Sequence, residues 1–278
     1  MKGPFGTKRA ESRQVQADLH VHTEWSYDGP NGSMERSCER AIEIGLPAIA
    51  FTDHADFVKV HPDQYCVDIV GYLEAVERCR AKFTGLRILS GVELGEPHWF
   101  ADETKAILSA GKLDHVLGSV HCVRLHGREV DASQFPGLSE ADFNVAVRSY
   151  FEETLAMLDS PHPFSTVAHL DYPKRYWQPG RAPYKESDYE EMLRAILVAT
   201  AKRGCALEVN TTRGGGETKL CPGLTVLRWW REVGGTAVSF ASDAHDPSKI
   251  AAGFELAADV VEAAGFKPSA EPTALWRR

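Results

Sequence analysis

Seven short apolar stretches recur along the chain, and most of them are rich in β-branched residues. Runs of this length and composition are typical of strands that are buried on both faces of a parallel sheet. The pattern therefore predicts seven strands, at residues 15–21, 47–52, 86–94, 115–121, 164–170, 205–210 and 236–242.

The segments between these stretches carry apolar residues at helical spacing and have recognisable ends. Ser33 precedes the first segment as an N-cap and Gly45 ends it, while Ser187 and Glu190 have the spacing of a capping box. The predicted helices cover residues 33–45, 68–85, 101–111, 139–160, 187–204, 222–235 and 246–265.

Seven alternations of strand and helix without a linker predict one α/β domain over residues 15–278, folded as a closed or nearly closed parallel barrel. Residues 1–14 are polar, and we expect them to form a disordered leader. An open, doubly wound sheet is the alternative. It is disfavoured because no G-x-G-x-x-G motif or phosphate-binding loop follows any predicted strand.

Composition and charge limit the partners and the compartment. The net charge of -8 gives no overall basic field, so we expect a small-molecule substrate rather than nucleic acid or a membrane surface. The six cysteines contain no C-x-x-C pair, which favours reduced thiols in the cytoplasm. No segment has the roughly 18 consecutive apolar residues of a membrane span, and the N-terminus lacks the apolar stretch of a signal peptide.

Histidines and carboxylates follow six of the seven predicted strands. In a barrel, the carboxyl ends of the strands open onto one face, where such folds place their active sites. The residues at these positions are His20, His22, Asp53, His54, Glu93, His121, His169, Asp243 and His245.

Each of these residues alone is better explained as a hydrogen-bonded core residue, but the set as a whole favours a metal site. So many buried imidazoles and carboxylates would be costly unless cations neutralise and engage them. Ligands without thiolates suit Zn, Mn, Fe or Co, and nine candidates imply two or three ions bridged by a carboxylate such as Glu93. Sites of this kind typically hydrolyse phosphate esters.

The order of the motifs resembles that of the PHP (polymerase and histidinol phosphatase) superfamily, and within it the monofunctional histidinol-phosphate phosphatases. The resemblance runs from about Asp18 to Gly265, and it implies a distorted (β/α)7 barrel with a trinuclear metal centre. The motifs that carry it are DLHVHTEWSYDG, AFTDHADF, GVELGE, HVLGSVHCV, VAHLDYPKRYW, LEVNTTR and FASDAHDP.

The resemblance also implies a ligand set for each ion. Many phosphatases of this type have a histidine at the position of Asp28, so the aspartate is a departure from their pattern. The implied sets are His20, His22, Glu93 and Asp243 for one ion; Glu93, His121 and His169 for a second; and Asp28, His54 and His245 for a third.

Cationic residues follow two of the later strands. Arg175 and Arg213 lie where this family places its phosphate-binding arginines, and guanidinium groups suit bidentate contacts with phosphate. Lys174 is a weaker candidate, for which a solvated surface charge is an equal alternative. The implied nucleophile is a metal-bound hydroxide, and no general acid is assigned. His115, which precedes a strand, is interpreted as structural.

The implied activity is the hydrolysis of L-histidinol phosphate to L-histidinol and phosphate, a step of histidine biosynthesis. One alternative is a PHP phosphoesterase that acts on another small phosphate ester or a nucleotide. A second is an amidohydrolase-type enzyme, although no predicted strand end offers the lysine that such enzymes carbamylate, and Glu93 occupies that role. A non-catalytic metal-binding regulator is a third alternative.

Overall fold

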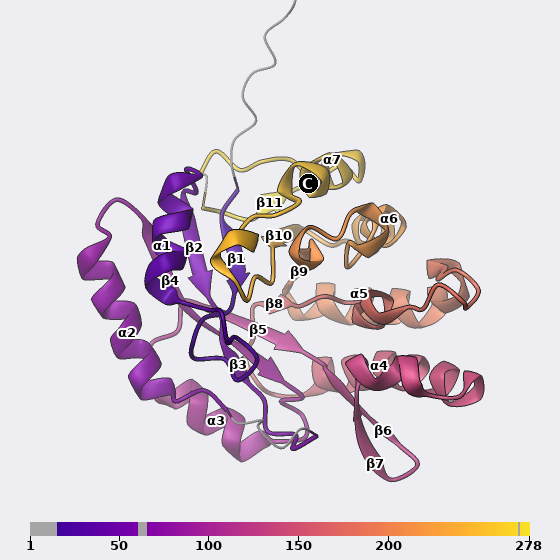
Figure 1. Ribbon diagram of the computed structural model, residues 1–278. Coiled ribbons are helices and arrows are strands. Elements are labelled where there is room, and N and C mark those ends of the chain that lie inside the picture. Colours follow the sequence, from indigo (N-terminus) through magenta and orange to yellow (C-terminus); the bar gives the residue numbers. More distant parts are fainter. Residues whose placement is uncertain (1–15, 61–65, 272) are drawn as a thin grey trace, which may run out of the picture.

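The computed structural model describes residues 16–60, 66–271 and 273–278, so the predicted leader lies outside the described residues. Each of the seven predicted strands is present within this part of the chain, and all seven run parallel in one curled sheet (Figure 1). In spatial order they are β1 (Asp18–Val21), β2 (Ala48–Phe51), β4 (Arg87–Gly95), β5 (His115–Ser119), β8 (Thr166–Val167), β9 (Ala206–Asn210) and β10 (Ala237–Ala241).

The sheet closes into a barrel only at the carboxyl ends of its first and last parallel strands. There, the His22 amide donates to the Ala244 carbonyl and the Asp243 amide donates to the His20 carbonyl, both at 2.9 Å. At the opposite end, β11 (Trp276–Arg277) pairs antiparallel with β10 instead. The predicted barrel is therefore confirmed, and its distortion has a local cause: two different segments share one edge of β10.

In the part of the chain that the structure describes, seven α-helices connect the strands and cover the outside of the sheet (Figure 1). Between helices and sheet lie two large apolar clusters, one under the first three helices and one under the last four. The helices are α1 (Met34–Glu43), α2 (Ile69–Lys82), α3 (Ala101–Ser109), α4 (Glu140–Asp159), α5 (Glu190–Arg203), α6 (Leu224–Glu232) and α7 (Phe254–Ala263). None of the described helices is long and apolar enough to cross a membrane.

Two predicted helix starts are wrong. The expected capping box of α5 does not form, because Glu186–Tyr189 adopt a 3-10 turn and no side chain caps the helix that begins at Glu190. Helix α7 begins eight residues later than expected. A 3-10 turn at Pro247–Lys249 replaces its predicted first turns, and Gly253, with a φ of 83°, directly precedes the helix.

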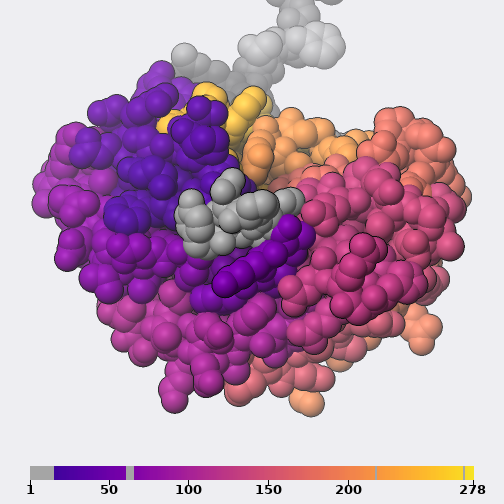
Figure 2. Space-filling view, turned by 60° about the horizontal axis from the view of Figure 1, so that its bottom comes forward, coloured from indigo at the N-terminus to yellow at the C-terminus, as the bar shows by residue number. Residues whose placement is uncertain are grey.

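Additional strands leave the barrel at its carboxyl end. The two-residue strand β3 (His54–Ala55) pairs with β4, and β6 (Cys122–Leu125) forms a hairpin with β7 (Arg128–Asp131) that projects from the barrel (Figure 1). His126 and Gly127 turn this hairpin with positive φ angles of 50° and 75°, as a two-residue turn requires. Figure 2 shows the side that carries β3: the violet segment after it lies between the N-terminal part and the part that includes α4.

Candidate metal centre

A polar cavity of about 140 Å³ opens at the carboxyl ends of the strands. Seven of the nine predicted metal ligands line it, and so do both predicted phosphate-binding arginines. The complete lining is Asp28, His54, Glu93, His121, His169, Tyr172, Arg175, Tyr176, Arg213, Asp243 and His245. The two remaining predicted ligands, His20 and His22, are fully buried against these residues.

The histidines of the first strand belong to a compact group of donor atoms. His20 in β1 and His22, directly after the last residue of β1, alternate with Leu19 and Val21, so both imidazoles point to the same side. Their Nε2 atoms lie 2.9 Å apart. Glu93 Oε2 lies 3.2 Å from His20 Nε2, and Asp243 Oδ1 lies 3.5 Å from His22 Nε2. The structure therefore brings the first predicted ligand set together.

Glu93 occupies the centre of the cluster, and each of its oxygens faces a different group of imidazoles. Oε1 lies 3.1 Å from His121 Nε2 and 2.8 Å from His169 Nε2. Oε2 lies 3.2 Å from His54 Nδ1 and also faces the two histidines of β1. A carboxylate with its two oxygens shared in this way has the geometry that a bridging ligand needs.

Asp28, the departure from the family pattern, also converges on the cluster. It lies in the loop after β1, where Gly29 packs so closely that a Cβ there would collide with the Thr23 carbonyl. This compact loop places Asp28 Oδ2 2.9 Å from His245 Nε2 and Asp28 Oδ1 3.6 Å from His54 Nε2. The third predicted ligand set is therefore also assembled in space.

The charges of the cluster suit a bound cation. Burial opposes ionisation of Glu93, but the nearby His20 and His121 outweigh it and hold the pKa of Glu93 well below its usual value. Burial likewise opposes ionisation of Asp243, yet Arg175 and His20 keep its pKa well below the usual value. Burial lowers the pKa of His22 far below 6.5, which favours the neutral imidazole with one ring nitrogen that can bind a cation.

Donor atoms that lack hydrogen bonds provide a test of whether metal ions fit. Three overlapping groups of side chains bring their ligand atoms within 4.8 Å of one another, and all involve predicted ligands. Among the described residues, four buried ring nitrogens of predicted ligands have no hydrogen-bond partner: His54 Nδ1, His121 Nδ1, His169 Nδ1 and His245 Nε2. His245 Nε2 lies close to Asp28 but outside hydrogen-bond geometry. Imidazole and carboxylate donors arranged in this way fit divalent cations.

Asp53 follows β2 as predicted but faces away from the cavity. Its oxygens accept hydrogen bonds from the Thr23 amide at 2.6 Å, the Thr23 hydroxyl at 2.8 Å and the Ser26 hydroxyl at 2.7 Å. Ser26 in turn lies 3.0 Å from His22 Nδ1. Asp53 therefore holds the loop and the ring behind the cluster, and its carboxylate is already saturated.

Two further buried carboxylates behind the histidines were not predicted from the sequence. Asp56 Oδ2 lies 3.4 Å from His54 Nδ1 and 3.3 Å from His121 Nδ1. Glu208 Oε2 lies 2.8 Å from His20 Nδ1. The only signal in the sequence was the presence of these acidic residues inside the motifs AFTDHADF and LEVNTTR.

The two arginines reach the cavity from neighbouring loops. Arg175 is largely buried; its Nη2 contacts Asp243 and lies 3.3 Å from Asn210 Oδ1. Arg213 Nη2 lies 2.8 Å from His245 Nδ1, and Arg213 Nε donates to the Asp243 carbonyl at 2.9 Å. Arg213 Nη2 also lies 3.8 Å from Asp243 Oδ1, so both guanidinium groups are held beside Asp243.

Lys174 does not reach this cavity. Its ammonium group is buried, donates to the Leu220 carbonyl at 3.0 Å and lies 3.4 Å from Glu186 and 3.6 Å from Asp171. The lysine is neither a cavity residue nor a solvated surface charge, so both sequence-based interpretations of Lys174 differ from the structure.

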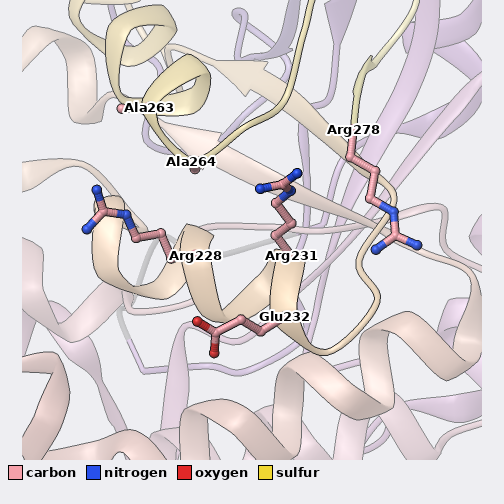
Figure 3. Close-up of a pocket in the computed structure, with 6 residues that line it drawn as sticks. All are labelled: Arg228, Arg231, Glu232, Ala263, Ala264 and Arg278. Carbon is pink, nitrogen blue, oxygen red and sulfur yellow. The ribbon is translucent and has the colours of Figure 1, made fainter.

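A larger concavity of about 610 Å³ lies elsewhere and is lined by Arg228, Arg231, Glu232, Ala263, Ala264 and Arg278 (Figure 3). Glu232 ends α6 shortly before β10 begins, so this concavity is at the amino-terminal end of the barrel. None of the predicted site residues, all of which the structure describes, lines it. The smaller polar cavity is therefore the candidate site.

Comparisons with known proteins agree with the fold and the motifs. The model of the PHP domain family matches residues 18–212. A Clostridium acetobutylicum protein described as "Probable histidinol-phosphatase" is 27% identical over 257 residues, covering 90% of this chain and 94% of that protein. The histidinol-phosphatase of Lactococcus lactis is 27% identical over 251 residues, covering 90% and 91%.

A solved structure has the same fold. The histidinol phosphate phosphatase of Lactococcus lactis, crystallised with Zn, L-histidinol and phosphate, superposes with a TM-score of 0.78. The two chains are 23% identical, and the match covers 94% of this chain and 97% of that one.

Proposed function

Since the chain belongs to the PHP domain family, we propose that it is a metal-dependent phosphomonoesterase that hydrolyses L-histidinol phosphate to L-histidinol and phosphate. One observation carries the proposal: a cluster of histidines and carboxylates and two arginines meet in a single cavity. The two relatives named histidinol-phosphatases each align with 90% of the chain. The Lactococcus lactis structure contains the product L-histidinol together with phosphate.

The proposed cofactors are two or three divalent ions, with Zn the first to test because the Lactococcus lactis structure contains it; Mn and Fe are the alternatives. When bound, such ions neutralise phosphate charge and lower the pKa of water toward neutrality. The residues proposed to hold them are His20, His22, Asp28, His54, Glu93, His121, His169, Asp243 and His245.

The two arginines are proposed to bind and orient the substrate phosphate. Arg175 and Arg213 extend from the loops after β8 and β9 and lie beside Asp243, so both can reach one ligand in the cavity. Planar guanidinium groups make paired hydrogen bonds to phosphate oxygens and thereby fix its orientation. Glu93 and His169 line the same cavity and are almost fully buried, so bulk water has little access to this side of it.

The small polar cavity supports a small phosphate ester as the substrate rather than a nucleic acid. Among the described residues, no lysine lines the cavity, which argues against the carbamylated lysine of an amidohydrolase-type site. We further propose that the enzyme acts in the cytoplasm, where its six unpaired cysteines would stay reduced.

A phosphate-release screen tests the proposal. The protein would be stripped of metal, reconstituted separately with Zn, Mn or Fe, and assayed on L-histidinol phosphate and on a panel of nucleotides and sugar phosphates. We expect the highest kcat/KM with L-histidinol phosphate. Turnover of nucleotides alone would instead support another PHP phosphoesterase, and equal activity without metal would overturn the metal-dependent reaction.

A further inference from the structure

Glu208 lies behind the cluster, against the ring nitrogen of His20 that faces away from the other ligands. It belongs to β9, its side chain is 1% exposed, and its Oε2 lies 2.8 Å from His20 Nδ1. Glu208 does not line the cavity. Any effect it has on the site must therefore pass through the residues that it contacts.

Three donors converge on the Glu208 carboxylate. While Oε2 faces His20, Oε1 accepts from the His169 backbone amide at 3.1 Å and from the Asn210 side-chain amide at 2.9 Å. His169 has a φ of 21°, which a residue with a side chain rarely adopts, and the hydrogen bond from its amide to Glu208 helps to hold this conformation. One buried carboxylate on β9 thus connects β1 with the segment that follows β8.

We propose that Glu208 is a positioning residue that holds His20 as the tautomer with its proton on Nδ1. An ionised carboxylate can only accept hydrogen bonds, so the facing Nδ1 must carry a proton. When a cation displaces any proton from Nε2, that nitrogen presents the lone pair that binds it. His20 Nε2 lies 2.9 Å from His22 Nε2 and 3.2 Å from Glu93 Oε2, among the other donor atoms. This inference rests on the proposed metal site.

The variant Glu208→Gln tests this role because an amide cannot satisfy all three donors. With its oxygen toward His20, its NH2 group would face the donors of His169 and Asn210. With its NH2 group toward His20, the ring must place its proton on Nε2, where it blocks metal binding. Both orientations weaken the site, and we expect Zn affinity to fall about 10- to 100-fold.

Zn affinity would be measured by competition with a chromophoric chelator, independently of catalysis. Glu153→Gln is the matched control: Glu153 also accepts from a histidine, His98 Nε2 at 2.7 Å, and from Trp99 at 2.8 Å, but none of the three lines the cavity. We expect this control to bind Zn like the wild type. Unchanged affinity in Glu208→Gln would overturn the inference, whereas a wild type that binds no Zn would overturn the proposed metal site instead.

A second measurement, on the wild type, tests the tautomer directly and does not depend on whether the Glu208→Gln variant folds. Long-range 1H–15N NMR of the Zn-loaded protein reports which ring nitrogen of each histidine carries the proton. We expect a proton on Nδ1 of His20. A proton on Nε2 would overturn the role of Glu208, whatever the stability of the variant.

Discussion

The two arginines of the cavity differ in how tightly the protein already holds them. The side chain of Arg175 is 13% exposed and contacts Asp243 directly, whereas that of Arg213 is 41% exposed and lies 3.8 Å from the same carboxylate. Arg213 also has a φ of 57°, a left-handed conformation that aims its side chain back toward His245. Arg213 is therefore the group better able to turn toward an incoming phosphate.

Replacing Arg213 with lysine keeps the charge but removes the planar fork. Because hydrogen bonds to charged groups contribute about 1.5–3 kcal/mol, we expect kcat/KM for L-histidinol phosphate to fall about 10- to 100-fold. Phosphate-release kinetics would measure the effect. Arg228→Lys, in the concavity at the other end of the barrel, is the matched control and is expected to keep full activity. Equal kinetics for both variants would contradict the role of Arg213.

His115 illustrates a buried histidine outside the cluster. It begins β5, its Nε2 lacks a hydrogen-bond partner, and burial lowers its pKa from 6.5 to about 4. As the pH falls below 6.5, His115 is therefore protonated in the unfolded chain but stays neutral in the folded protein. The stability associated with neutral His115 is lost progressively as the pH falls from about 6.5 to about 4.

The variant His115→Leu should show a smaller loss of stability in acid. The lowered pKa of His115 corresponds to about 3 kcal/mol between neutral pH and pH 4, and the leucine variant lacks this contribution. Urea unfolding at a series of pH values from 7.5 to 4 would compare the two slopes. Parallel curves for the wild type and the variant would show that His115 does not contribute to acid sensitivity.

Among the elements, the short strand β11 covers one edge of the sheet and contributes a large side chain to the core. It covers the part of the β10 edge that β1 does not reach, and Trp276 is 1% exposed. The Trp276 ring packs against Phe240 with 5.0 Å between ring centroids, and its indole donates to Gln16. This two-residue strand thus covers the edge of β10 at the end of the barrel that β1 does not close.

Truncating the Trp276 side chain tests how much its packing contributes to the free energy of unfolding. Trp276→Ala is expected to lower the free energy of unfolding by about 3–5 kcal/mol, because it leaves a large cavity in the core. Arg277→Ala, in the same strand but exposed, should change it by less than about 0.5 kcal/mol. Denaturant unfolding measures both. Similar values for the two variants would mean that the strand pairing, and not the buried ring, stabilises this edge.

The sequence predicts the parallel strands and most helices because their apolar spacing reflects burial directly. It does not predict the β6–β7 hairpin, whose two-residue His126–Gly127 turn is a weak signal without its strands. The start of α7 is also missed, because tertiary contacts override local pattern there: the Ala251 amide is bonded to Asp18, far away in the sequence.

The same distinction applies to the site. The alternation of His20 and His22, and the position of each ligand at a strand end, are local features that the sequence displays. The roles of Glu208 and Asp53 are not local, because both contact residues far away in the chain: Glu208 lies 188 residues from His20, and Asp53 accepts from Thr23 and Ser26. Lys174 shows the converse, since a cation in a motif typical of phosphate binding lies instead beside the buried Asp171 and the partly exposed Glu186.

For the whole molecule, the cluster lies where the first and last parallel strands close the barrel. His20 lies in β1 and His22 directly follows it, whereas Asp243 follows β10, and backbone hydrogen bonds join the two segments at this point. Without cations, the site gathers several buried carboxylates and imidazoles at the edge where the two strands meet. Bound ions would connect these strands, so the proposed metal site should stabilise the entire fold.

Metal removal tests this coupling. A ligand that binds only the folded state adds about 2.7 kcal/mol at 100 times its Kd, which corresponds to roughly 5–10 °C in the melting temperature of a chain of this size. We therefore expect chelator-treated protein to melt lower and Zn to restore the melting temperature, as followed by circular dichroism. Glu93→Gln should lose most of the Zn-dependent increase because the central carboxylate is replaced, whereas Glu153→Gln should retain it. If the metal-free and reconstituted proteins melt together, the ions do not connect the two edges, and the backbone bonds between β1 and β10 suffice to close the barrel.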